Sequence, residues 1–360
     1  MITENLKKVI VLLALALSHS LLCQNKSIFT YADREMKAYD STPGISLLIY
    51  HKGEVIYDKS TGYANYEFEV PSDPTFSYAI GSISKQFTAV LILKLCEEKK
   101  LSLSDDISAY FKNPKISNAG IKIEHLLSHT SGIKDFLYKE NLMDQYTQQL
   151  PYEEIVEFLL DTPYSFPPGE KYEYSNTNYI LLAKIIEKVT SKTFSEAIAH
   201  YIIQPLKMEG TFVGSSKKLY KKTVSGYNIT DQNNFVPDIY LPFSLNWVDG
   251  AGSMYSTTSD LLIWKSAIEN KLLLNDESTN LLLSPYKLNN GDETGFGFGY
   301  EVENKNDIKI LKKSGAINGF QSNMIWIPAE DIFVIGLTNR VDKPPKFVYE
   351  IGYMLLNIAH

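Results

Sequence analysis

The sequence predicts an α+β fold in which strands from both ends of the chain form a single antiparallel sheet. Two strand-like segments, 44–50 and 54–63, lie near the N-terminus, and about four more follow residue 296. The pattern between them is mostly helical. An apolar sheet face must be covered by another layer, and connections between packed elements are short. The simplest packing therefore joins the two chain ends in one sheet flanked by helices and inserts a mostly helical part.

The individual elements follow from local patterns. A helix is expected over 27–40, and His51-Lys52-Gly53 between the first two strands is a hairpin signal. Helical patterns recur over 121–127, 133–165, 178–189, 194–203 and 259–269, whereas 210–256 is rich in loops. The remaining strand candidates are 297–302, 308–313, 322–327 and 332–337, and a helix over 347–358 follows.

We expect residues 24–360 to form one domain. Its α/β part covers about 27–100 and 290–360, and its helical part covers about 101–289. The 360 residues are 44% hydrophobic and 21% charged, as in ordinary globular proteins, and the net charge is −7. An acidic chain without a basic stripe argues against nucleic-acid binding.

Residues 1–23 have the pattern of a secretory signal peptide. Lys7 and Lys8 precede an apolar segment, 9–17, that is too short to span a membrane. We expect cleavage near Cys23 and export to a bacterial periplasm or to the medium. A lipid anchor at Cys23, the only expected route to a membrane, is less favoured, because Leu22 stands where a small residue is expected. Cys96 then has no disulfide partner.

The most informative stretch runs from Ala79 to Lys85 and precedes an apolar segment, 87–96. This segment is apolar nearly all round, which is typical of a buried helix. If the helix starts near Ser82, then Ser82 and Lys85 share one face, about 4.5 Å apart along the axis. Serine is a good nucleophile only when a neighbour takes its proton, and lysine can do so only if its pKa falls well below about 10.4. The alternative is that Ser82 merely caps the helix and Lys85 is solvated.

Two further motifs lie far from this stretch in the sequence. Tyr174-Ser175-Asn176 stands just before an apolar helix, and Lys313-Ser314-Gly315 lies on a candidate strand. With Ser82-Ile83-Ser84-Lys85, this set resembles the motifs of the serine β-lactamase and penicillin-binding protein superfamily. The tyrosine resembles that of the class C β-lactamase-like branch, which includes esterases and D-amino-acid peptidases. The segments HLLSHTSG (125–132) and SGAINGF (314–320) also look like family segments, so the resemblance covers nearly the whole mature chain.

The resemblance implies a role for each motif residue. Ser82 would attack the substrate carbonyl and become acylated, and Lys85 and Tyr174 would share the acid–base work, with the choice of base left open. Asn176 would hydrogen-bond Lys85 or a substrate amide. The backbone N–H groups of Ser82 and Ala316 would form the oxyanion hole.

The third motif would bind substrate through Lys313, Ser314 and Gly315. Lys313 would lower the pKa of Tyr174 and pair with an anionic group of the substrate. We therefore expect a preference for substrates that carry a carboxylate near the scissile bond. The alternative is that Lys313 only tunes the electrostatics of the site.

A metal site is not expected. His125 and His129 have the four-residue spacing of ligands on a helix, but no catalytic glutamate stands between them, and the resembling family uses this segment structurally.

We therefore expect an exported serine hydrolase that works through an acyl-enzyme without a cofactor. The substrate would be a small molecule or peptide with an ester, a D-amino-acid peptide bond or a β-lactam amide. The alternative is a penicillin-recognising receptor or pseudoenzyme that is acylated but does not turn over. Neither the natural substrate nor the oligomeric state follows from the sequence.

Overall fold

A computed structural model describes residues 26–356, with gaps at 115, 118, 139–151, 162–163, 216–217, 233 and 239–244. The expected signal peptide and Cys23 lie outside the described residues. Within them, no helix is long and apolar enough to cross a membrane.

The predicted sheet is confirmed, and both ends of the chain form it. Its six strands lie in the order β10-β11-β12-β13-β1-β2, with every neighbouring pair antiparallel. The strands are β1 (Ile45–His51), β2 (Glu54–Thr61), β10 (Glu301–Lys305), β11 (Ile308–Ile317), β12 (Phe320–Ile327) and β13 (Ile332–Thr338). β1 pairs with β13, from Ile45 opposite Thr338 to His51 opposite Ile332.

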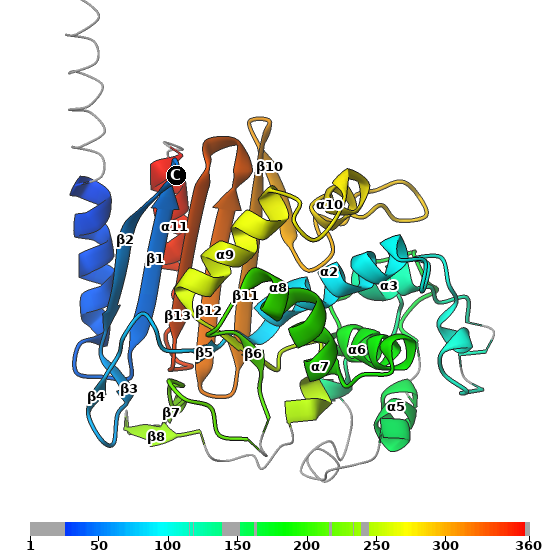
Figure 1. Cartoon of the computed structure of the whole chain (residues 1–360), viewed down its shortest axis with the longest axis horizontal. Helices are drawn as coiled ribbons and strands as arrows, with labels where there is room; N and C mark the ends of the chain where they lie inside the picture. Colours follow the sequence, from blue (N-terminus) through cyan, green and yellow to red (C-terminus); the bar gives the residue numbers. More distant parts are fainter. Residues whose placement is uncertain are drawn as a thin grey trace, which may run out of the picture.

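Helices cover both faces of the sheet because successive side chains of a strand point to opposite sides. In β1, Leu47 and Ile49 pack in one core, with the helix over 26–36 and α11 (Phe347–Leu355). Leu48 belongs to the larger core on the other face, where α2 (Ser84–Glu97) and α9 (Thr258–Glu269) lie. Figure 1 shows α9 crossing the sheet face opposite α11, with α2 leading away from the sheet into the helical part.

The helical part packs around α2. Its helices are α3 (Ile123–Leu127), α5 (Tyr152–Leu160), α6 (Asn176–Thr190), α7 (Phe194–Ile198), α8 (Gln204–Leu206) and α10 (Asp276–Leu282). As its sequence predicts, α2 is buried nearly all round: α6, α7 and α10 contact it, and Phe87 stacks on Trp264 with ring centroids 4.0 Å apart. The central helix is therefore rigidly held, which fixes the residues at its start.

Some boundaries differ from the expected ones. The strand expected over 297–302 begins only at Glu301, because Gly299 has a φ of +85° and the chain turns there. β11 continues past Lys313 to Ile317. The loop-rich region contains short strands β6 (Phe212–Val213), β7 (Tyr227–Ile229), β8 (Phe235–Pro237) and β9 (Met254–Ser256).

The region 133–165 is less helical than expected. Its described residues hold a 3-10 turn, Phe136–Tyr138, and the nine residues of α5. Short strands β3 (Tyr63–Asn65), β4 (Val70–Pro71) and β5 (Tyr78–Ala79) connect β2 to the stretch that contains Ser82.

Candidate active site

Ser82 lies in a 3-10 turn, Gly81–Ile83, and α2 itself starts two residues later at Ser84. The glycine before Ser82 is required by the packing. Gly81 has a φ of +50°, and a Cβ added there would lie 2.7 Å from the backbone nitrogen of Ala316. The turn therefore lies directly against the end of β11.

The three expected catalytic residues meet at Ser82 Oγ. Tyr174 Oη lies 2.8 Å from this oxygen, and Lys85 Nζ hydrogen-bonds to it at 3.1 Å. Lys85 is one turn along from Ser82, whereas Tyr174 stands at the N-terminal side of α6. The spacing of Ser82 and Lys85 thus has the geometry of a nucleophile and its base.

Lys85 is fully buried and its nitrogen has three acceptors. Besides Ser82 Oγ, it bonds to Asn176 Oδ1 at 2.8 Å and to the carbonyl of Ala251 at 2.7 Å. Burial is the main cause that holds the pKa of Lys85 well below its usual value, and the charge of Lys313 adds to it. A lysine in this setting loses its proton more readily than a solvated one, which favours its acceptance of the Ser82 proton.

The expected effect on Tyr174 was wrong in direction. Lys85 and Lys313 do lie close, with Nζ atoms 5.0 and 5.1 Å from the centroid of its ring. Nevertheless the pKa of Tyr174 is raised, because burial disfavours the phenolate and outweighs the lowering effect of its hydrogen bond with Ser82. Burial therefore favours the protonated phenol of Tyr174 and the neutral amine of Lys85.

Lys313 is a buried cation beside two aromatic rings. Its side chain on β11 is 2% exposed, and Nζ lies 4.6 Å from the ring centroid of Phe296. Among the described residues, no hydrogen bond or ion pair engages it. Burial lowers the pKa of Lys313 to about 8, and Glu301 acts in the opposite direction. At neutral pH Lys313 thus presents a positive charge without a partner.

The expected oxyanion hole lies where β11 meets the turn that contains Ser82. A Cβ on Gly315 would lie 3.0 Å from the backbone nitrogen of Ser82 and 2.1 Å from the carbonyl oxygen of Ile80. Together with the close approach of Gly81 to Ala316, this brings the amides of Ser82 and Ala316 next to each other. Gly315 is therefore needed for close packing.

A cavity of about 480 Å³ joins these groups. It is lined by Ser82, Tyr174, Asn176, Lys313, Ser314, Gly315 and Ala316, together with Tyr172, Phe296, Glu301 and Gln321. Of the residues to which the resemblance gives a role, all except Lys85 line this space, and Lys85 lies behind Ser82. The four additional lining residues were missed because isolated aromatic and polar residues carry no motif.

Asp135 is the functional residue most clearly missed from the sequence. It lies three residues after the HLLSHTSG segment (125–132) and is 6% exposed. Its Oδ2 accepts hydrogen bonds from the backbone nitrogen of Asn176 at 2.9 Å and from Asn176 Nδ2 at 2.7 Å. The sequence does place Asp135 close to the HTSG residues of this segment. Its partner Asn176, however, can be identified only from the fold.

The two histidines support the site structurally. His129 packs against Tyr174, with ring centroids 4.4 Å apart, and its Nδ1 accepts a hydrogen bond from the backbone nitrogen of Ser175. His125 Nδ1 accepts a hydrogen bond from the backbone nitrogen of Lys122. In the described part of the chain, no group of three His, Cys, Asp or Glu residues could hold a metal ion.

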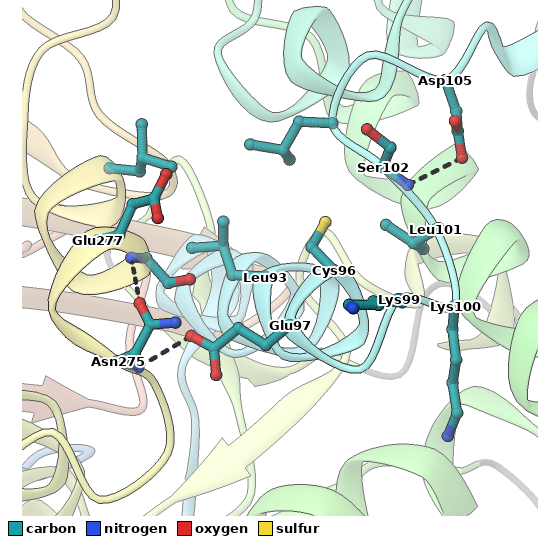
Figure 2. Close-up of a pocket in the computed structure, with 13 residues that line it drawn as sticks. Leu93, Cys96, Glu97, Lys99, Lys100, Leu101, Ser102, Asp105, Asn275 and Glu277 are labelled. Atoms are coloured by element: carbon teal, nitrogen blue, oxygen red, sulfur yellow. Dashed lines mark hydrogen bonds between the residues drawn. The ribbon is translucent and has the colours of Figure 1, made fainter.

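A larger cavity of about 680 Å³ lies at the other end of α2. Figure 2 shows that backbone nitrogens engage two of its carboxylates: Glu97 accepts from the backbone nitrogen of Asn275, and Asp105 accepts from that of Ser102. Cys96 lies in its wall, and burial raises the pKa of this thiol to about 12, which disfavours the nucleophilic thiolate. The chemistry is therefore concentrated at the Ser82 cavity.

Comparison with known proteins agrees with this geometry. Residues 32–357 match the Beta-lactamase family. Protein flp of Staphylococcus aureus is 28% identical over 325 residues, which cover 88% of this chain and 63% of that protein. Penicillin-binding protein 4* of Bacillus subtilis is 30% identical over 304 residues, which cover 80% of this chain and 66% of that protein. The chain thus spans less than two thirds of the length of these curated relatives.

A solved structure is also similar. The octameric penicillin-binding protein homologue from Pyrococcus abyssi superposes with a TM-score of 0.79 at 29% identity, over 92% of this chain and 77% of that one.

Proposed function

Because the chain belongs to the Beta-lactamase family, we propose that it is an exported serine hydrolase acting through an acyl-enzyme on Ser82. The observation that carries the proposal is the position of the Lys85 amine, buried and 3.1 Å from Ser82 Oγ. The two N–H hydrogens of neutral Lys85 are donated to Asn176 Oδ1 and to the carbonyl of Ala251. Its lone pair is then directed at Ser82.

Acylation follows from this arrangement. Lys85 takes the hydroxyl proton as Ser82 Oγ bonds to the substrate carbonyl carbon, and the amides of Ser82 and Ala316 stabilise the oxyanion. Tyr174, held protonated by burial, donates its proton to the leaving group as the scissile bond breaks. The proton held by Lys85 then passes to the Tyr174 phenolate, which restores neutral Lys85 and protonated Tyr174. A water that attacks the acyl-enzyme reverses the same proton transfers, and no cofactor is required.

The proposed substrates are esters, D-amino-acid peptides or β-lactams that carry a carboxylate near the scissile bond. The unpaired charge of Lys313 in the cavity wall supports the carboxylate. The names of two similar proteins refer to penicillin binding, which supports a substrate of the β-lactam or D-amino-acid peptide type.

Export rests on the signal-like residues 1–23. N-terminal sequencing of exported protein should give a start near residue 24, and a start before residue 18 would contradict it.

Parallel labelling with a fluorescent penicillin and a fluorophosphonate, followed by burst kinetics with a chromogenic ester, tests the activity. Steady turnover after the burst supports a hydrolase. A stoichiometric burst without turnover would instead support the receptor alternative, and no labelling by either probe would contradict both.

A further inference from the structure

Among the described residues, the carboxylate of Asp135 is the one anion whose charge acts on Lys85. The other groups around Lys85 are Lys313 on β11, the rings of Tyr174 and Tyr179, and the imidazole of His129. Asp135 reaches this group through one residue, because Asn176 bonds to it by Nδ2 and to Lys85 by Oδ1. A continuous chain of hydrogen bonds therefore runs from Asp135 through Asn176 and Lys85 to Ser82.

Asp135 is firmly held in place. Oδ1 accepts from the backbone nitrogen of Leu137 at 3.1 Å, and Oδ2 accepts from the backbone nitrogen of Asn176, the first residue of α6. Ser175, at the cap position of this helix, makes no side-chain cap hydrogen bond, so Asp135 supplies the cap from another segment. A helix N-terminus and three N–H donors therefore hold this carboxylate in one orientation.

The carboxylate of Asp135 determines which way the Asn176 amide faces. An amide has a donor end and an acceptor end, and Asp135 accepts only from the donor end. Asn176 Oδ1 is therefore turned toward Lys85, where it occupies one N–H of the amine. If the amide were reversed, its N–H₂ would face the lysine and compete for the same lone pair that Ser82 needs.

We propose that Asp135 is a positioning residue of this hydrolase: it orients the Asn176 amide so that the Lys85 lone pair faces Ser82, and its negative charge acts on the Lys85 amine. The inference rests on the proposed function and deepens it. Asp135 acts through Asn176 and Lys85 and does not contact the substrate.

The charge and the orientation can be separated by two substitutions. Asp135→Asn removes the charge but keeps an oxygen acceptor, so protonated Lys85 loses a stabilising neighbour and its pKa falls. The acid limb of the pH–rate profile, the pH range over which the acylation rate falls as the pH is lowered, should then move to lower pH by about 1 unit. Asp135→Ala also removes the acceptor, so the plateau rate should fall by about 10- to 100-fold.

The rate to measure is that of Ser82 labelling by a fluorophosphonate, followed by intact-protein mass across pH. The matched control is Asp260→Asn. Asp260 is also a buried carboxylate that accepts from a backbone nitrogen, that of Gly210, and from Thr211, but it lies outside the group around Lys85. Its substitution should leave the acid limb in place.

An acid limb that does not move in folded Asp135→Asn would overturn the role of the charge. If that variant does not fold, Asp135→Glu keeps the charge that caps α6 but displaces the oxygens. We expect an unchanged acid limb and a lower plateau for it, and an unchanged plateau would overturn the positioning role. Wild-type protein that is not labelled at Ser82 would instead show that the proposed function itself fails.

Discussion

Lys313 Nζ lies 5.1 Å from the ring centroid of Tyr174, yet this proximity does not make the tyrosine more acidic. Burial of the phenol outweighs the neighbouring cations. The positive charge of Lys313 is consequently not committed to Tyr174, and no described residue pairs with it. It faces the cavity and is free to meet a charge on a substrate.

The first prediction concerns this charge. Lys313→Ala should weaken kcat/KM for a carboxylate substrate by about 1.5–3 kcal/mol more than for its methyl ester, because only the former loses a charge-assisted pair. The comparison is made with both substrates in wild type and variant. Equal losses for the two substrates would leave Lys313 with an electrostatic role alone.

The second prediction is the pH dependence of that preference. Lys313 is charged below its pKa of about 8, so the preference for the carboxylate substrate is fully present below this pH and lost as pH rises through it. The ratio of kcat/KM for carboxylate and methyl ester should therefore fall between about pH 7 and pH 9. In Lys313→Ala the ratio should be flat, and a wild-type ratio that is equally flat would argue against the assignment.

The third prediction concerns the shared proton transfer. Lys85→Ala and Tyr174→Phe should each slow acylation by roughly 10²–10⁴, the range typical of acid–base groups. Since both act on the same proton path through Ser82 Oγ, the double variant should be only slightly slower than the worse single variant. Stopped-flow acylation rates measure this, and a double variant that loses the product of both factors would mean that the residues act independently.

The fourth prediction tests the oxyanion hole by packing. Gly315→Ala places a methyl 2.1 Å from the Ile80 carbonyl oxygen and 3.0 Å from the Ser82 nitrogen, so the turn and β11 must separate. Acylation should fall by about 10²–10³, as for loss of one oxyanion donor. Gly53→Ala is the control: it has a positive φ but nothing within 4 Å, so it should cost stability without slowing acylation. Equal rates for both variants would exclude this position for the hole.

Local patterns were sufficient to predict the sheet and the central helix. The apolar runs of β1 and β13 and the apolar run after Lys85 are local features, which one sequence displays directly. The strand boundary at Glu301 was missed because the conformation of Gly299 is set by tertiary packing. A Cβ there would lie 3.0 Å from the backbone of Gln86.

The site was predictable as far as its motifs extend. Ser82, Tyr174 and Lys313 were found because motif residues recur at fixed offsets. Asp135 was not, since its partner Asn176 is 41 residues away and only the fold brings them together. The direction of the Tyr174 pKa shift was also beyond the sequence, because it depends on how deeply the phenol is buried.

The central claim is that Ser82 is the nucleophile, and intact-protein mass spectrometry after fluorophosphonate treatment tests it most directly. Wild type and Ser84→Ala should each gain one adduct, because Ser84 is buried and its Oγ accepts a hydrogen bond from the backbone nitrogen of Met254. Ser82→Ala, which removes a single hydroxyl, should stay folded and gain no mass. A folded Ser82→Ala protein that still gains the adduct would contradict the account, because the nucleophile would then lie elsewhere.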